Sequence, residues 1–371
     1  MEPLAIYVHW PYCARICPYC DFNIYKQRAD SGLIDAITQD ITTQAIGIGP
    51  RRLRSIHFGG GTPSLLSPKE LERILSRIKE NFDVTADCEI AIEANPQDAD
   101  QDKWQAYAAL GVSRLSLGVQ SFYDPALNIL GRDHSAAQAK EALAVAADIF
   151  ASVSVDLIFG WAGQNQELLG QDLDVCLSSG AHHISAYQLT IEEGTAFAKA
   201  EARGDIKAVG PEDSAGFYDL IHARLTGEGF EHYEVSNFAK AGHRSRHNLT
   251  YWEGGDYMGV GPGAHGRLTQ GGKRYATIAS MRPEDYKKKH LQEQVQLTQT
   301  EWAEEYLLMG LRIETGISIA RFETIGGRAL DKSLITGFRE DGLMRLSGDM
   351  LSATPKGRLV LNRLTEKLLI H

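Results

Sequence analysis

Residues 4–20 read LAIYVHWPYCARICPYC, an apolar run that is followed at once by three cysteines. The run LAIYVH (4–9) has the β-branched and aromatic composition that is typical of a buried strand. Cys13, Cys17 and Cys20 then fall within eight residues of one another. A strand that delivers three thiols to one loop is therefore the feature from which the rest of the chain can be interpreted.

Strand and helix patterns alternate along the first half of the chain and beyond. Helical patterns such as LIDAITQDITTQAI and AAQAKEALAVAADIF lie between short apolar runs. This alternation predicts an α/β fold with a parallel sheet, open because six units are too few for an eight-stranded barrel. The run FEHYEV (230–235) could add one more strand. The six expected strands are 4–9, 54–58, 89–93, 114–119, 153–159 and 183–189.

Polar or glycine-rich segments follow all six expected strands. In parallel β/α folds the ligand-binding groups gather on loops at the carboxyl ends of the strands. We therefore expect one composite site that draws on the end of every strand. The contributing segments are the cysteine triplet, Gly59–Ser64, Glu93–Pro96, Gly118–Phe122, Asp156–Gly160 and Tyr187–Gln188.

The cysteine triplet is open to three interpretations. A redox dithiol, CPYC, needs only two cysteines and a helix N-terminus to activate the first, but helical periodicity resumes only near Ser31. A zinc site needs a fourth Cys or His, for which His9 is the one close candidate. Three thiolates on one loop can instead hold three irons of a [4Fe–4S] cluster and leave the fourth iron open. We favour the cluster because the triplet follows the first strand of the series.

Composition and charge exclude several other classes of protein. The 371 residues carry 38 Lys plus Arg against 48 Asp plus Glu, and a net charge of −10 does not attract nucleic acid or anionic lipid. No apolar run reaches the about 18 residues of a membrane span, and MEPLAIYVHW lacks the features of a signal peptide. We expect a cytoplasmic protein. Five cysteines do not suggest a disulfide framework, so Cys88 and Cys176 are expected in the core.

Three features taken together resemble the radical S-adenosylmethionine (SAM) superfamily: CxxxCxxC after the first strand, GGGTP after the second, and the sixfold β/α rhythm. In that superfamily the amino and carboxylate groups of SAM chelate the open iron, and an electron from the reduced cluster can cleave the sulfonium. The resemblance implies that Cys13, Cys17 and Cys20 hold a [4Fe–4S] cluster, that SAM is a second cofactor, and that an electron donor serves the cluster.

The flanking residues narrow this resemblance, which extends over nearly the whole chain. YVHWPYC (7–13), CPYCDFN (17–23), DLIFG (156–160) and EVSNF (234–238) are similar to the group that contains oxygen-independent coproporphyrinogen oxidase and the HemW-type haem chaperones. Matched motif by motif, the resemblance implies a SAM site formed by Tyr7, Tyr19, Gly60, Gly61, Thr62, Glu93, Gln120, Arg132, Asp156 and Gln188.

Two features favour the chaperones within this group. The segment HNLTYW (247–252) matches their HNxxYW stretch, in which His247 could ligate a haem iron while Tyr251 and Trp252 contact the porphyrin. Without the family, a single histidine beside aromatic residues is more often part of the core. The oxidase-like pattern is CxxxCxxCxC, with a fourth cysteine two residues after the third. This chain has Phe22 at that position. The role of His265, at the end of a glycine-rich loop, stays open.

The resemblance thus implies a haem chaperone that binds a cluster, SAM and haem, and that hands haem to haem-requiring proteins such as membrane respiratory enzymes. The alternative is a radical SAM enzyme of porphyrin biosynthesis that resembles coproporphyrinogen III oxidase. A thiol-redox or electron-transfer protein is a third interpretation. Whether the chain is an enzyme is left open, as is a homodimer.

The tail from Thr298 has a different pattern. Helical segments, the hairpin pattern LMRLSGDMLSA and a final helix that begins at Pro355 resemble a winged helix. Its Lys plus Arg equal its Asp plus Glu at ten each, so we expect no nucleic-acid partner. The expected organisation is a (β/α)6 partial barrel in 1–240, a connector with the HNxxYW motif in 241–297, and a winged-helix-like domain in 298–371.

Overall fold

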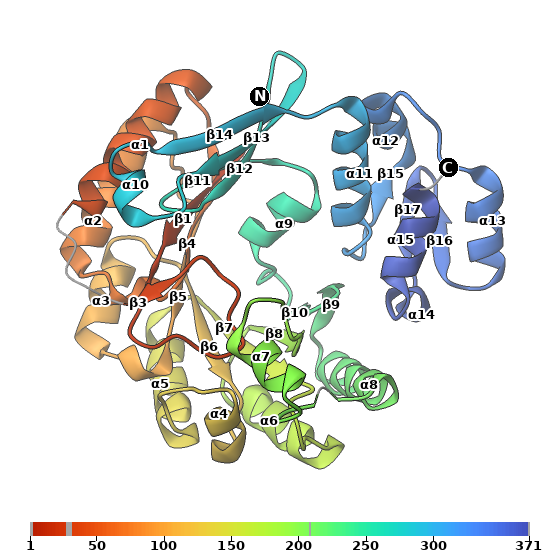
Figure 1. The fold of residues 1–371 in the computed structure, drawn as a ribbon, viewed down its shortest axis with the longest axis horizontal. Coiled ribbons are helices and arrows are strands. Elements are labelled where there is room, and N and C mark those ends of the chain that lie inside the picture. The colour runs from red at the N-terminus through yellow and green to blue at the C-terminus, as the bar shows by residue number, and fades with distance from the viewer. Residues whose placement is uncertain (1–2, 27–31, 208, 370–371) are drawn as a thin grey trace.

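A mixed α/β sheet organises the chain, which the computed structural model describes over residues 3–26, 32–207 and 209–369. Among these residues, twelve strands form the main sheet in the order β14-β13-β12-β11-β1-β4-β5-β6-β7-β8-β10-β9 (Figure 1). The strands from β11 to β8 in this order pair in parallel, and the strands outside them pair antiparallel. The expected open parallel α/β sheet is therefore confirmed.

Six of the parallel strands are those that the apolar runs predict, and their ends differ from the predicted ends by at most two residues. The register between β1 and β4 places Tyr7 beside His57 and Trp10 beside Gly60. The bounds of these strands are β1 (Leu4–Trp10), β4 (Leu53–Gly60), β5 (Glu89–Ala94), β6 (Arg114–Gln120), β7 (Ser152–Phe159) and β8 (His183–Gln188).

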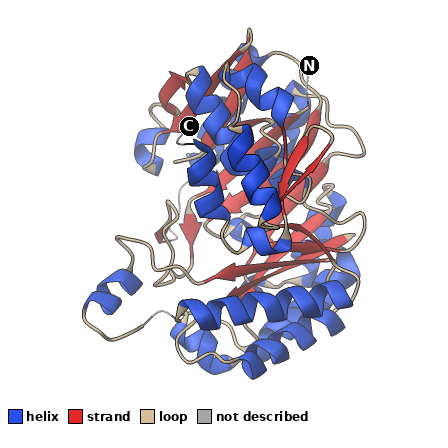
Figure 2. Cartoon of the chain, turned by 90° about the vertical axis from the view of Figure 1, so that its right-hand side faces the viewer, coloured by secondary structure: helices blue, strands red, loops and turns tan. Residues whose placement is uncertain are grey.

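Helices connect the parallel strands and cover the outer side of the sheet (Figure 1 and Figure 2). Two of them, α2 and α5, begin with a capping box, in which two side chains accept from each other's backbone amides. The pairs are Ser67 with Glu70 and Ser135 with Gln138. The bounds are α1 (Leu33–Ile48), α2 (Pro68–Asn81), α3 (Gln101–Ala109), α4 (Asp124–Ile129), α5 (Ala136–Ile149), α6 (Gln166–Ser178), α7 (Ala196–Ala202) and α8 (Pro211–Gly227), with short 3-10 turns η1 (Pro63–Leu65) and η2 (Pro96–Asp98).

The main core lies between these helices and the sheet. Alternate residues of β1, including Leu4, Ile6 and Val8, are completely buried, as are Ile56 and Phe58 of the neighbouring strand β4. Each such side chain contributes about 1.5–3 kcal/mol by leaving water. Cys88 and Cys176 belong to the same core, as expected. The central strands are therefore held firmly.

Residues 241–297 differ from the expected connector because they extend the main sheet. β11 adds a parallel strand beside β1, and β12, β13 and β14 continue antiparallel from it. A Cβ on Gly259 would lie 2.1 Å from the His265 carbonyl oxygen, so the glycine permits the close approach of β11 and β12. The bounds are α9 (Arg246–Trp252), β11 (Asp256–Val260), β12 (His265–Gln270), β13 (Lys273–Ala279), α10 (Pro283–Tyr286) and β14 (Leu291–Gln296).

The run FEHYEV forms β9 (Glu231–Glu234), which is antiparallel and joins the sheet through β10 (Asn237–Ala239). β9 is therefore the last strand at one edge of the sheet, and it is not part of the parallel β/α series. No helix among the described residues is both long and apolar enough to cross a membrane.

The C-terminal residues form the expected winged-helix-like unit, which has its own apolar core. The predicted hairpin is present, but the predicted final helix is divided between α14 and α15. The bounds are α11 (Gln299–Gly310), β15 (Ile317–Ser318), α12 (Ile319–Gly326), α13 (Lys332–Glu340), β16 (Met344–Ser347), β17 (Met350–Ala353), α14 (Pro355–Arg358) and α15 (Leu361–Leu369). Arg312 reaches back to the fully buried Glu234 at 2.7 Å. Separate folding of 1–240, 241–297 and 298–371 stays a prediction.

A buried ion network that holds β11 to the sheet gives a test of this architecture. Asp256 accepts from Arg51 at 3.1 Å and from Arg274 at 2.6 Å, and all three side chains are almost completely buried. Asp256→Ala would leave two buried cations without their carboxylate, so we expect a loss of about 3–5 kcal/mol in the free energy of unfolding.

Urea denaturation of the unloaded protein measures this loss. The control is Asp87→Ala, which removes the exposed ion pair between Asp87 and Arg52 and should cost less than about 1 kcal/mol. Equal effects of the two substitutions would contradict the structural role given to Asp256.

Candidate functional site

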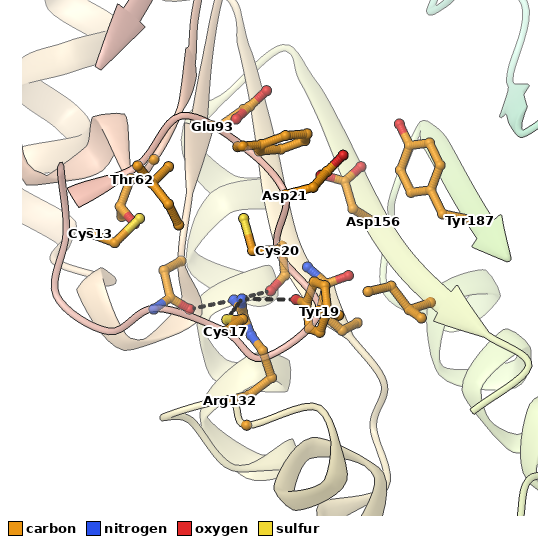
Figure 3. A pocket seen from close by; sticks show the side chains of 18 of the residues that line it. Cys13, Cys17, Tyr19, Cys20, Asp21, Thr62, Glu93, Arg132, Asp156 and Tyr187 are labelled. Carbon is orange, nitrogen blue, oxygen red and sulfur yellow. Dashed lines mark hydrogen bonds between the residues drawn. The ribbon is translucent and has the colours of Figure 1, made fainter. Parts of the chain in front are cut away.

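A cavity of about 400 Å³ opens at the carboxyl ends of the parallel strands, beneath the loop that carries the three cysteines (Figure 3). The loop is held at both ends, because β2 (Tyr12–Cys13) pairs with β3 (Tyr25–Lys26). Most of the residues predicted for the site line this cavity: Cys13, Cys17, Tyr19, Cys20, Gly60, Gly61, Thr62, Glu93, Gln120, Arg132, Asp156 and Gln188. Tyr7 and His247 do not line it.

The three thiols approach the cavity from one loop and none of them is in a disulfide. Cys13 is buried, whereas Cys17 and Cys20 are half-buried, and the Cys20 amide closes a turn on the Cys17 carbonyl at 3.2 Å. Burial raises the pKa of the Cys20 thiol to about 11, and it raises the pKa of the Cys13 thiol as well. The unloaded thiols of Cys13 and Cys20 are therefore protonated at neutral pH, and a metal centre would have to displace those protons.

The surroundings of the cysteines do not suit a redox dithiol. Among the described residues, the first helix after them, α1, begins at Leu33, so CPYC does not lead directly into a helix as a redox dithiol does. Among the described residues, no three Cys, His, Asp or Glu side chains are grouped closely enough to hold a single ion. A cluster places different demands on the thiols, because each thiolate binds a different iron. The donor set thus fits an iron–sulfur cluster.

Arg132 ties the cysteine loop to the strand ends. Its Nη1 donates to the Cys17 sulfur at 3.3 Å and to the Tyr19 hydroxyl at 3.4 Å, while its Nη2 donates to Asn95 Oδ1 at 2.9 Å (Figure 3). Its Nε is buried and has no partner among the described residues. Arg132 also lines the cavity, so its guanidinium brings a positive charge that suits an anionic group of a ligand.

Two carboxylates give the opposite wall a negative charge. Glu93 Oε1 accepts from His57 Nε2 at 2.9 Å, and Asp156 Oδ2 accepts from the Ser116 hydroxyl at 2.9 Å. Burial raises the pKa of Asp156 to about 6, so its carboxyl group is mostly ionised at pH 7.5. The cavity therefore offers a cation-binding wall that faces an anion-binding arginine.

Gln120 has a strained backbone at the end of β6. It has a φ of 69°, the one positive φ at a non-glycine position within the described ranges. The pairing of β6 with β7 shifts between Leu117 and Gln120, which brings the side chain to the cavity. Such strain costs about 1–3 kcal/mol and clusters at functional sites. Among the residues predicted for the site, Gln120 is therefore the one whose backbone conformation most strongly indicates a functional role.

Gly60, Gly61 and Thr62 line the cavity, but their amides have partners within the chain. The Gly60 amide donates to Glu93 Oε2 at 3.3 Å, and the Gly61 and Thr62 amides donate to the carbonyls of Trp10 and Tyr12 at 2.7 Å and 2.9 Å. These donors are thus already used within the chain. The run lines the cavity because it packs closely against β1.

Tyr7 lies under the cavity, where its hydroxyl is 3.0 Å from His9 Nδ1. It supports the cysteine loop indirectly, since His9 Nε2 reaches the Asn23 carbonyl at 3.0 Å. Asn95, Asp133 and Tyr187 also line the cavity, and of these only Tyr187 and Asn95 belong to segments that the sequence predicts for the site. The segment Glu93–Pro96 indicated where Asn95 would lie, whereas Asp133 follows α4 and carries no signal of its own.

The role predicted for His247 as a haem ligand does not fit this geometry. His247 is 1% exposed, its Nδ1 is 3.0 Å from the Ser55 hydroxyl and its Nε2 is 2.5 Å from the Tyr251 hydroxyl. Both ring nitrogens are therefore occupied. A haem iron could bind His247 only after Tyr251 had moved away.

Two family models match this chain. The radical SAM superfamily matches residues 7–176, and the HemN C-terminal domain matches residues 297–360. In solved structures, coproporphyrinogen III oxidase (HemN) from Escherichia coli has a TM-score of 0.82 at 23% identity, covering 98% of this chain and 89% of that one. At this identity the likeness shows the fold alone.

Curated relatives match almost the whole chain. Radical S-adenosyl methionine domain-containing protein 1, mitochondrial, from Bos taurus is 38% identical over 98% of this chain and 87% of its own. Heme chaperone HemW from Bacillus subtilis is 35% identical over 96% and 97%, and that from Haemophilus influenzae is 34% identical over 100% and 98%. The chain therefore belongs to the radical SAM family that includes heme chaperone HemW and radical S-adenosyl methionine domain-containing protein 1.

Proposed function

We propose that the protein is a haem chaperone that binds a [4Fe–4S] cluster, SAM and haem, and delivers haem to haem-requiring proteins. The observation that carries this proposal is the 35% identity to heme chaperone HemW over 96% of the chain. An electron donor and client proteins, membrane respiratory enzymes among them, are the proposed partners.

The cavity supports the cofactor part of the proposal. Cys13, Cys17 and Cys20 would hold the cluster, which supplies an electron to SAM when it is bound and reduced. Glu93 and Asp156 would attract the cationic groups of SAM, and the Arg132 guanidinium would attract its anionic group.

Haem needs a different ligand from the buried His247. We propose His265, which begins β12 and is the one exposed histidine among the described residues. Burial on one side and the nearby Arg267 lower the pKa of His265, so its imidazole is neutral and able to bind iron. Phe22 is 62% exposed and Met281 is 42% exposed. The side-chain Nδ2 of Asn23 donates to the Met281 carbonyl at 2.8 Å and so holds the two segments together. Phe22 and Met281 thus form an exposed apolar surface at this end of the sheet.

The second candidate function is a coproporphyrinogen oxidase-like radical SAM enzyme, favoured by the fold likeness to HemN. Against it, this chain has the exposed Phe22 in the cavity lining, at the position of the fourth cysteine in the oxidase-like pattern CxxxCxxCxC. A direct comparison of haem binding with coproporphyrinogen turnover therefore separates the two functions.

The cluster is tested by replacing its proposed ligands one at a time. After anaerobic reconstitution with iron and sulfide, Cys13→Ala, Cys17→Ala and Cys20→Ala should each lose most of the iron content and the cluster absorbance, because a remaining pair of thiolates does not hold a four-iron cluster. Cys88→Ala is the control, since Cys88 lies in the core away from the cavity. A full cluster in Cys13→Ala would return the cysteines to the dithiol interpretation.

The chaperone and the oxidase predict opposite results for haem binding and for coproporphyrinogen turnover in one preparation. The wild type should bind haem stoichiometrically and form no protoporphyrinogen from coproporphyrinogen under reducing, SAM-replete conditions. His265→Ala should shift or abolish the Soret band, whereas His247→Phe should leave it unchanged. Turnover of coproporphyrinogen without haem binding would overturn the chaperone, and loss of haem in His247→Phe alone would return the ligand to the HNxxYW motif.

A further inference from the structure

A layer of stacked rings lies beneath the cavity and outside the set of residues that line it. His57 of β4 stacks on His247, with ring centroids 4.7 Å apart at an interplanar angle of 15°. The Tyr7 ring lies beside both, with its centroid 6.1 Å from that of His57 at 19° and 6.2 Å from that of His247. His247 comes from α9, and Tyr7 comes from β1. Three segments that are distant in the sequence thus meet at His57.

His57 connects this layer to the cavity through a single hydrogen bond. Its Nε2 lies 2.9 Å from Glu93 Oε1, and because a carboxylate only accepts, Nε2 carries the hydrogen. Its Nδ1 is buried and has no partner among the described residues. The bond to Glu93 is therefore the one hydrogen bond of the His57 ring among the described residues.

The HNxxYW motif fixes the far side of the stack. His247 is held at Nδ1 by Ser55, at Nε2 by Tyr251, and at its backbone amide by Glu89 Oε1 at 3.1 Å. A ring that is restrained at all three points has little freedom to rotate. It therefore presents a rigid face on which His57 is held at a fixed distance and tilt.

The glycine run also limits the Glu93 carboxylate. A Cβ on Gly59 would lie 2.9 Å from Glu93 Oε1 and 3.1 Å from His57 Cδ2, so both side chains pack directly against the bare backbone of β4. Glu93 itself is 37% exposed and lines the cavity. Its carboxylate is thus positioned at Oε1 by His57 and at Oε2 by the Gly60 amide.

We propose that His57 is a positioning residue for Glu93, and that the HNxxYW motif acts on the SAM cavity through the stacked pair of His247 and His57. This inference rests on the proposed binding of SAM. It assigns to the motif a role in holding a SAM-binding carboxylate, in place of direct ligation of haem iron. Trp252, at the end of α9, packs under the Arg312 guanidinium at 4.7 Å, so the motif also contacts the C-terminal unit.

Two substitutions at His57 separate the hydrogen bond from the stack. His57→Phe keeps an aromatic ring against Tyr7 and His247 but removes the donor, whereas His57→Gln keeps an N–H group at the reach of Nε2. With the cluster reconstituted, SAM affinity measured by calorimetry should fall about ten- to a hundredfold in His57→Phe, the effect expected when a hydrogen bond to a charged group is lost. His57→Gln should stay within about threefold of the wild type.

His247→Ala extends the test to the motif, because it removes the face on which His57 stacks. We expect SAM affinity to fall by about three- to tenfold while the iron content and the haem Soret band stay as in the wild type. Thermal unfolding of each unloaded variant shows whether the fold is intact. If His57→Phe does not fold, the test is made with His57→Gln, whose SAM affinity must match that of the wild type.

The outcomes separate this inference from the proposed function. Wild-type affinity in His57→Phe, or equal losses in His57→Phe and His57→Gln, would overturn the positioning role while leaving SAM binding in place. A reconstituted wild type that does not bind SAM would overturn the proposed cofactor and this inference with it. Loss of haem instead of SAM in His247→Ala would show that the motif ligates haem.

Discussion

The parallel pairing of β1 with β11 on one side and β4 on the other is the constraint on which the rest of the structure depends. It buries Leu4, Ile6 and Val8 completely and fixes the point at which β1 ends. Since the central strands run in the same direction, they end at one edge of the sheet. The cysteine loop, which follows β1 directly, therefore faces the ends of β4 to β8, and the cavity forms between them.

The parts of this account that depend on local sequence could be predicted. Buried strands are short and apolar, so the six central strands were recognisable, and the cysteine spacing marked the loop that covers the cavity. β11 was missed because DYMGV is short and leads into glycines, so its strand character depends on pairing with β1. The division of the final helix into α14 and α15 was likewise not visible in its apolar pattern.

The direction in which a side chain points was harder to predict than its membership of a motif. His247 belongs to the expected motif, but α9 packs against β4 and buries its imidazole between Ser55, Tyr251 and His57. The amides of the glycine run bind Glu93 and the carbonyls of Trp10 and Tyr12, although the run itself lines the cavity. In both cases long-range packing decided which atoms remained free, and local sequence does not encode that packing.

The central claim is that the cysteine loop and the acidic strand ends form one site for a cluster and SAM. Electron paramagnetic resonance of the reconstituted and reduced protein, recorded with and without SAM, tests it most directly. If SAM binds the open iron, the spectrum of the reduced cluster changes when SAM is added, and Cys88→Ala behaves as the wild type does. A four-iron spectrum that SAM leaves unchanged would contradict the claim.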